Sequence, residues 1–379
     1  MRCKTYKMEE TLESIIDYRG KTPRKSDDGI LTLSAKSVRD GYIDYSQCYY
    51  ISEDEYNRFM VRGFPQIGDV LMTTEAPLGV TARLDRDDVA LAQRLLTLRG
   101  KKEILDTGYL YYYLRSPTGQ AKLHERQTGT TVSGIKQAEF RKIEIDLPDI
   151  DKQQRIVSIL GDLDDKIKTN TEINENLLQQ AEVIFKDKFL SNYILPEGWK
   201  TLTLGDVSDM TAGGDKPKII SDLKTEECQY PIYSNGINDE GLYGFTNDYK
   251  IIEESVTVSA RGTIGYVCLR HTPFTPIVRL VTLIPHKGII SAKYLYLWLK
   301  NIQIHGTGTT QQQLTIPDFR KTEIVIPSEK SMKQFTETID PLFQQIWTNQ
   351  EQNTKLANIR DALLPKLMSG ELDVSELDL

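Results

Sequence analysis

The stretch from residue 156 to residue 184, IVSILGDLDDKIKTNTEINENLLQQAEVI, decides the architecture of this chain. Apolar residues and asparagines recur in it at alternating steps of four and three, the pattern of a helix that pairs with another helix through a heptad seam. Residues 335–367 repeat this pattern in the same register. The expected seam positions are Ile156, Leu160, Leu163, Ile167, Asn170, Asn174, Leu177, Ala181 and Ile184, then Phe335, Ile339, Leu342, Ile346, Asn349, Asn353, Leu356, Leu363 and Leu367.

The two helices are expected to pair with each other as an antiparallel coiled coil. Each seam carries two asparagines, and a buried polar seam residue lowers stability but fixes register and partner. Asp149 and Ser328 are expected N-caps, and Gly370 can end the second helix. A helix of about 38 residues is about 57 Å long, so the pair would form a spacer rod. The alternative is that Asn170 and Asn349 merely face solvent.

These helices belong to a duplication that organises the whole chain. Matched residues lie 179 positions apart near the helices and 185 to 194 positions apart upstream, so each repeat has a variable N-terminal region and a constant helical end. The expected segments are a first variable domain (1–148), a central long helix (149–192), a second variable domain (193–327), and a C-terminal long helix with an acidic tail (328–379). The matches include Thr128-Gly129-Thr130-Thr131 with Thr307-Gly308-Thr309-Thr310, Phe140-Arg141-Lys142 with Phe319-Arg320-Lys321, and Arg94-Leu95 with Arg279-Leu280.

The variable domains are expected to mix strands and short helices, which gives an α+β fold. Strand-like runs occur at residues 70–72, 95–98, 255–258 and 280–284, with Gly- and Pro-rich turns between them. Residues 109–115 and 294–300 are expected to form short helices that pack through aromatic and leucine side chains.

Composition narrows the class of protein. The 379 residues suffice for two or three domains, 39% are hydrophobic, and no run approaches 18 apolar residues. The four cysteines lack CxxC spacing, which favours free thiols in a cytoplasmic protein and no metal site. The net charge of −7 argues against nucleic acid when taken alone. However, residues 151–192 carry 8 acids and 6 bases and residues 329–379 carry 9 acids and 5 bases, so the variable domains are near neutral.

The sequence does not contain the common catalytic motifs. Arg19-Gly20-Lys21-Thr22 resembles the end of a P-loop, but Ile15 replaces the required glycine and Pro23 blocks the following helix. No GxSxG, HExxH, or Asn/Asp-Pro-Pro-aromatic motif occurs. The acidic cluster of Asp162, Asp164 and Asp165 could hold a metal, but a solvated helix face is the favoured interpretation. No catalytic residue is therefore assigned.

Several loops carry side chains that could contact DNA. Arg261 stands among small residues at an expected hairpin tip, and arginine to guanine is the commonest specific major-groove contact. Ser234 and Asn235 offer polar side chains on a turn. The alternatives are an ordinary hairpin with a surface arginine and a plain type I′ turn. The two Gly-Thr-Thr loops have the same sequence but are followed by different residues. Their candidate DNA-reading residues are Thr130 and Thr131 in the first repeat and Thr309, Thr310, Gln311 and Gln312 in the second.

A basic N-terminal stretch and the matching basic residues of the second repeat could contact phosphates. Such contacts would position DNA without specifying bases. The alternative is that these charges are simply solvated. The candidates are Arg19, Lys21, Arg24 and Lys36, echoed by Lys216 and Lys218.

Together these residues resemble the specificity (S) subunit of type I restriction-modification systems. The resemblance rests on residues 195–199 (LPEGW), 203–207 (TLGDV), Gly213-Gly214 and residues 231–237 (PIYSNGI), with the tandem layout of domain, helix, domain, helix. The first repeat lacks the LPEGW opening and has Arg19-Gly20-Lys21 in place of the Gly-Gly turn.

The resemblance implies a non-catalytic subunit with two target recognition domains, each reading one half of a split, asymmetric site in double-stranded DNA. The paired helices would set the spacer and dock two methyltransferase (M) subunits, which bring S-adenosylmethionine and flip the target adenine. Two restriction (R) subunits with ATP- and Mg-dependent translocase and nuclease activity can join. Two alternatives stay open: a self-contained restriction or methylation enzyme, and a scaffold that carries two protein-binding domains.

Overall fold

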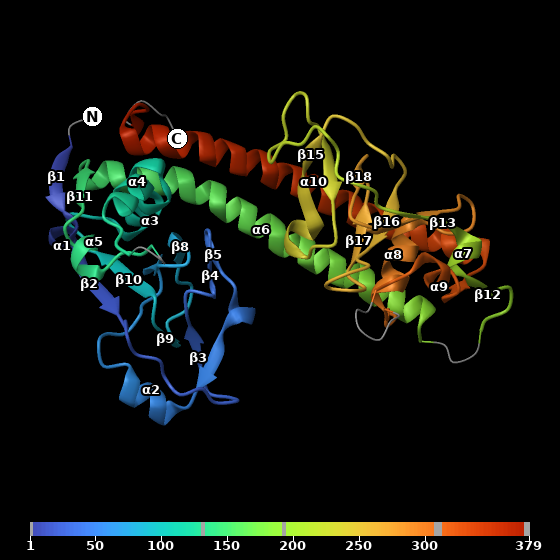
Figure 1. Ribbon diagram of the computed structural model, residues 1–379, viewed down its shortest axis with the longest axis horizontal. Coiled ribbons are helices and arrows are strands. Elements are labelled where there is room, and N and C mark those ends of the chain that lie inside the picture. The colour runs from blue at the N-terminus through green and yellow to red at the C-terminus, as the bar shows by residue number, and fades with distance from the viewer. Residues whose placement is uncertain (1–2, 130–132, 192–194, 307–312, 375–379) are drawn as a thin grey trace. The chain divides into compact units, whose positions relative to one another are not determined.

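The computed structural model describes residues 3–129, 133–191, 195–306 and 313–374 (Figure 1). The chain folds into two compact units, one formed by residues 1–170 and 351–379 and the other by residues 171–350. We call them unit 1 and unit 2 and describe each by itself.

Unit 1 is built on a four-stranded antiparallel sheet, in the order β2-β10-β7-β8. A second sheet has the order β6-β3-β9, in which β3 and β9 run parallel. Two-stranded pairs join β1 to β11 and β4 to β5. The strands are β1 (Lys4–Lys7), β2 (Leu12–Asp17), β3 (Ile30–Leu33), β4 (Val38–Arg39), β5 (Tyr42–Ile43), β6 (Tyr49–Ile51), β7 (Val70–Thr74), β8 (Leu78–Arg83), β9 (Val89–Leu91), β10 (Leu95–Gly100) and β11 (Glu144–Leu147). The short helices are α1 (Met8–Thr11), η1 (Tyr45–Gln47), α2 (Glu53–Phe59), α3 (Thr107–Arg115), α4 (Pro117–Glu125) and α5 (Gln137–Phe140).

Unit 2 repeats this topology, except that the strands described there include no counterpart of the β4–β5 pair. Its four-stranded sheet has the order β13-β19-β16-β17, its three-stranded sheet is β15-β14-β18 with β14 parallel to β18, and β12 pairs with β20. The strands are β12 (Lys200–Thr203), β13 (Ser208–Ala212), β14 (Tyr230–Tyr233), β15 (Leu242–Thr246), β16 (Ser255–Val258), β17 (Val267–Arg270), β18 (Thr275–Pro276), β19 (Val281–Pro285) and β20 (Glu323–Ile326). The short helices are α7 (Leu204–Val207), η2 (Asn238–Gly241), α8 (Ala292–Lys300) and α9 (Ile316–Phe319). The α+β class and the duplication are confirmed.

Two long helices, α6 (Ile150–Phe189) and α10 (Glu329–Ser369), complete the fold. Their expected caps are present, because the Lys152 backbone N–H donates to Asp149 at 3.0 Å and the Ser331 N–H donates to the Ser328 hydroxyl at 3.3 Å. Gly370 follows the last turn of α10 with φ +74°, a backbone conformation that suits glycine.

The helices pack antiparallel, and the asparagines lie at the seam. In unit 1 the Asn170 amide donates to Asn353 Oδ1 at 2.8 Å, and in unit 2 Asn349 donates in the same way to Asn174 Oδ1 at 2.8 Å. Asn170 and Asn349 are almost fully buried. The alternative that they face solvent is therefore wrong, and the helix pairing is confirmed.

Each unit has its own apolar core under these helices. In unit 2 an aromatic cluster joins α6, α8 and α10, with Phe185 in contact with the rings of Tyr294, Trp298 and Phe335. Phe185 and Phe189 were not among the expected seam positions. An α-helix repeats every 3.6 residues and not every 3.5, so the buried face drifts away from a strict heptad seam along a helix of this length. In the described part of the chain, no helix has both the length and the apolar character needed to cross a bilayer.

Candidate nucleic-acid interface

In unit 2 several loops meet at one end of the strands of the four-stranded sheet. The turn after β18 reaches the turn after β13, where the Arg279 N–H donates to the Gly213 carbonyl at 2.8 Å. The β16–β17 hairpin holds the segment that follows the Gly-Thr-Thr loop, because the Leu314 N–H donates to the Ala260 carbonyl at 3.0 Å. Backbone hydrogen bonds thus join segments that are far apart in sequence into one loop cluster.

Asn235 ties this cluster together. Its side-chain nitrogen donates to the Val278 carbonyl at 2.6 Å, and its side-chain oxygen accepts the Ala260 backbone N–H at 2.7 Å. One amide therefore links the loop after β14 to the β16–β17 hairpin and to the β18–β19 turn. With both ends of the amide engaged, Asn235 is placed to position its neighbours. Ser234 lies beside it, half-buried, in a loop that spans residues 234–241, so the plain type I′ turn is wrong.

Glycine is required at Gly213. A Cβ atom there would lie 2.7 Å from the backbone nitrogen and oxygen of Ile277, closer than real Cβ contacts come. The missing side chain lets the β13 and β18 ends touch, and Gly214 forms a parallel bridge with Ile277.

Arginines project from this cluster. Arg261 sits at the tip of the β16–β17 hairpin, as expected, and is exposed, while its Nε donates to Gln313 Oε1 at 3.0 Å. Arg279 is also exposed and has φ +60°, next to Val278 with φ +54°. Two successive non-glycine residues in the left-handed region are uncommon and strained. Sequence reasoning missed Arg279 as a site residue, although its match to Arg94 was visible.

The basic candidates of unit 2 lie on the surface. Lys216 Nζ hydrogen-bonds the Tyr243 hydroxyl and lies 4.2 Å from the centre of that ring. Lys218 is exposed. These ammonium groups are accessible to an anion.

Unit 1 has the same arrangement of loops, which we call the loop frame, with different side chains. Arg94 occupies the position of Arg279 and is again left-handed, with φ +69°. At the hairpin tip, however, Glu75 stands where unit 2 has Arg261, and it forms an ion pair with Arg94 Nε at 2.8 Å. Glu75 also bridges Gly134, at the end of the Gly-Thr-Thr loop. The frame is shared and its charge is reversed at one position.

The N-terminal basic residues are spread over unit 1. Arg19 and Lys21 follow β2, where unit 2 has its glycines, and Arg19 Nη1 donates to the Ile135 carbonyl at 3.5 Å. Lys36 is exposed in the turn after β3. Arg24 lies beside α2, where its backbone N–H donates to Glu55 at 3.0 Å. Arg19 is thus near the loop frame, whereas Arg24 is held by another element.

Six candidates lie outside the described residues: Thr130, Thr131, Thr309, Thr310, Gln311 and Gln312. The helix-pairing candidates are all described, and each is buried or half-buried: Leu163, Ile167, Asn170, Asn174, Leu177, Leu342, Ile346, Asn349, Asn353 and Leu356.

The acidic cluster on α6 differs from its expected role at one residue. Asp162 and Asp165 are exposed, but Asp164 is half-buried and bonds Tyr112 and Arg360. The solvated-face interpretation is wrong for Asp164. Within the described ranges, no group of three or more His, Cys, Asp or Glu residues is arranged to hold a metal ion.

Comparisons with known proteins agree with this architecture. The family model for the type I restriction modification DNA specificity domain matches twice, at residues 10–179 and 196–358. The MjaIX specificity subunit of Methanocaldococcus jannaschii is 28% identical over 367 residues, which covers 86% of this chain and 82% of that protein. A putative type I specificity subunit of Mycoplasma pneumoniae is 32% identical over 212 residues, which covers 53% of this chain and 56% of that protein.

The fold has a solved counterpart. The crystal structure of the type I restriction-modification S subunit from M. genitalium matches with a TM-score of 0.60 at 16% identity, over 97% of this chain and 96% of that one. The double match of the family model covers most of the sequence and coincides with the structural repeat. The chain therefore belongs to the type I restriction modification DNA specificity family.

Proposed function

We propose that this chain is the DNA-reading subunit of a type I restriction-modification complex, in which each variable domain (1–148 and 193–327) reads one half of a bipartite, asymmetric site. The observation that carries the proposal is the shared loop frame with unlike side chains. Two identical frames would read two identical half-sites. Glu75 against Arg261 at one position of that frame gives the halves different chemistry.

The side chains divide into three roles. Arg261 and Arg279 extend from the cluster and are suited to guanine edges, which accept two hydrogen bonds from a guanidinium. Arg19, Lys21, Lys36, Lys216 and Lys218 are suited to phosphates, which position the duplex. Asn235 and Gly213 hold the loops in place. Arg24, the Gly-Thr-Thr residues and their following glutamines stay candidates from the sequence.

The helices supply the spacing. The α6–α10 pair would set the unread spacer and dock two methyltransferase subunits. Those partners bring S-adenosylmethionine, and two restriction subunits bring ATP- and Mg-dependent cleavage. This chain reads DNA and does not itself catalyse, and it works in the cytoplasm. Because the variable domains are near neutral, the methyltransferases would supply much of the phosphate contact.

The test is single-molecule sequencing of adenine methylation in cells that express this chain with its methyltransferase. A split motif with an unread spacer is expected, and exchanging residues 193–328 should change one half only. R261A should relax specificity within that same half, by about 1–3 kcal/mol at one base pair. Methylation that persists unchanged without this chain would refute the proposal in favour of a scaffold.

A further inference from the structure

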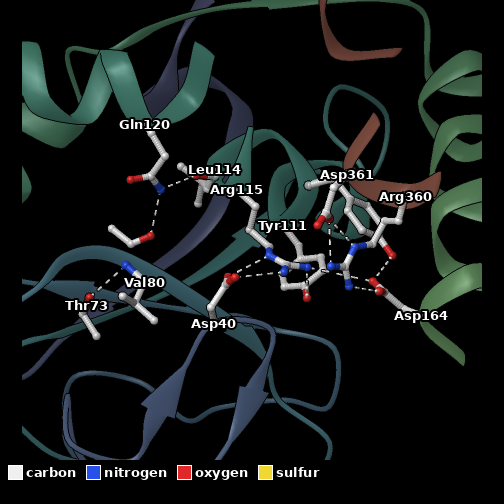
Figure 2. Close-up of polar contacts among 12 residues, drawn as sticks. Asp40, Thr73, Val80, Tyr111, Leu114, Arg115, Gln120, Asp164, Arg360 and Asp361 are labelled. Atoms are coloured by element: carbon white, nitrogen blue, oxygen red, sulfur yellow. Dashed lines mark hydrogen bonds and ion pairs between the residues drawn. The ribbon is translucent and has the colours of Figure 1, made fainter. Parts of the chain in front are cut away.

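A polar network joins the variable domain of unit 1 to both long helices (Figure 2). Arg360 Nη1 of α10 donates to Asp164 Oδ1 of α6 at 2.8 Å, and the Tyr112 hydroxyl donates to Asp164 Oδ2 at 2.8 Å. Arg115 of α3 lies between Asp40 and Tyr111, with distances of 3.0 Å to Asp40 Oδ1 and 2.8 Å to the tyrosine oxygen. The ion pair between Asp164 and Arg360 is the part of this network that crosses from one long helix to the other.

This pair is partly shielded from water. The Arg360 side chain is 17% exposed and the Asp164 side chain 25%. Burial disfavours the charge on Arg360, but hydrogen bonds to Asp164 and Asp361 outweigh it and raise the pKa of the guanidinium. Removing either partner would leave a shielded charge with weaker compensation: Arg360 would keep Asp361 at 2.8 Å, and Asp164 would keep the Tyr112 hydroxyl and Arg115 at 4.0 Å.

Unit 2 has apolar residues at the equivalent positions. A shift of 179 residues takes Asp164 to Phe343 and Arg360 to Ala181. Phe343 and Ala181 are both buried in the apolar core of unit 2. The repeats therefore differ in polarity at this cross-helix contact.

The asparagines, in contrast, are the same in both repeats. Asn170 bonds Asn353 and Asn349 bonds Asn174, and each bond maps onto the other under the same shift. The Asn353 amide donates to the Ile167 carbonyl at 3.3 Å, and Asn174 donates to the Ile346 carbonyl at 3.3 Å. If α6 paired with α6 of another copy, Asn170 would face Asn174 and the same bonds would form. The bonds between the asparagines fix direction and register but do not themselves distinguish like from unlike helices, although Asn170 also donates to Gln352 Oε1 at 2.9 Å, where a second α6 would present Ile173.

We propose that the Asp164–Arg360 ion pair makes the two long helices of one chain select each other and reject the same helix of a second copy of the chain. Two α6 helices would place Asp164 opposite Ala181, and two α10 helices would place Arg360 opposite Phe343. Each wrong pairing takes the cross-helix partner away from a partly shielded charge. One ion pair thereby disfavours both wrong pairings.

Two full-length double variants test this. D164F/R360A gives all three pairings the apolar contact of unit 2, and A181R/F343D gives all three the ion pair of unit 1. D164E/R360K is the matched control, because it keeps the opposite charges. Each protein is followed by native mass spectrometry across a concentration series, with helix content checked by circular dichroism. We expect each of the two test variants to raise the dimer-to-monomer ratio about tenfold, with the control at the wild-type ratio.

A spin label identifies which helices pair. Residue 172 lies midway between Asn170 and Asn174, so in an α6–α6 pair it comes level with the same residue of the other copy, on the exposed sides of the two helices. A single nitroxide on E172C, with Cys3 and Cys48 replaced by serine, should give a short, defined spin–spin distance only in the dimers of the test variants, since helix axes packed about 8–10 Å apart hold the two labels level on the outer sides of the pair. The proposal is overturned if both test variants stay at the wild-type ratio. It is equally overturned if the wild type shows the short distance, or if both test variants lose their helices while D164E/R360K keeps them.

Discussion

Asn235 offers a sharp test of the loop cluster, because its two hydrogen bonds can be removed separately. N235A removes both the acceptor for the Ala260 N–H at 2.7 Å and the donor to the Val278 carbonyl at 2.6 Å. N235D keeps an acceptor near Ala260 but places a carboxylate against the Val278 carbonyl. A typical hydrogen bond contributes about 0.5–1.5 kcal/mol net, so N235A should loosen the loops by roughly 1–3 kcal/mol.

The direct assay is hydrogen–deuterium exchange at the Ala260 amide. Exchange through local opening speeds up tenfold for each ~1.4 kcal/mol lost. N235A should therefore accelerate Ala260 exchange by about five- to a hundredfold, whereas N235D should leave it nearly protected. The midpoint of global urea unfolding should move little, since the change lies in surface loops.

DNA recognition supplies the second readout for Asn235. Both variants should weaken methylation of one half-site, because both disturb the Val278 turn next to Arg279. Unchanged protection of Ala260 in N235A would refute the reasoning, because the bond from the Ala260 N–H to Asn235 could not then be holding the hairpin. Equal deprotection of Ala260 in N235A and N235D would refute the separate roles of the two amide atoms.

Other substitutions probe the frame and the cores. G213A should destabilise unit 2 by more than about 2 kcal/mol in urea unfolding, because a Cβ would lie 2.7 Å from Ile277 backbone atoms; a change below 0.5 kcal/mol would contradict the geometry. F185A should lower the free energy of unfolding by about 3–5 kcal/mol and L364A, at the equivalent position of unit 1, by about 2–5 kcal/mol; a loss under 1 kcal/mol for F185A would contradict the close packing of the aromatic cluster. Burial raises the pKa of the Cys268 thiol to about 11, so alkylation at pH 8, followed by mass spectrometry, should be much slower there than at an ordinary exposed thiol; the reactive thiolate gains population only as the pH rises toward that pKa.

The helices and the duplication could be predicted from sequence because both are periodic. A heptad seam and a constant shift of 179 residues are visible without any contact information. Prediction failed where the helix drifts from strict heptad spacing, so the buried Phe185 and Phe189 were missed. It failed again at Asp164, whose neighbours in sequence are solvated but whose partner Arg360 lies 196 residues away.

The candidate site was predictable in its parts and not in its assembly. Arg261 and Asn235 could be chosen because each stands among small or turn-forming residues. Their relation depends on bonds from Asn235 to residues 25 and 43 positions away, which no local pattern encodes. Arg279 escaped because its special feature is a backbone angle of +60°, and arginine carries no preference for that region.

The two arginines with left-handed backbone angles indicate that the two variable domains present a positive charge in the same way and differ in the charges around it. A left-handed residue with a side chain costs roughly 1–2 kcal/mol, yet Arg94 and Arg279 both adopt this conformation. In unit 1 Glu75 neutralises the arginine at 2.8 Å, whereas in unit 2 the same hairpin tip adds Arg261 as a second cation. One backbone device thus presents an arginine paired with a glutamate in one repeat and an arginine accompanied by a second arginine in the other. A duplicated protein that must read two unlike half-sites needs this combination of a constant frame and a variable charge.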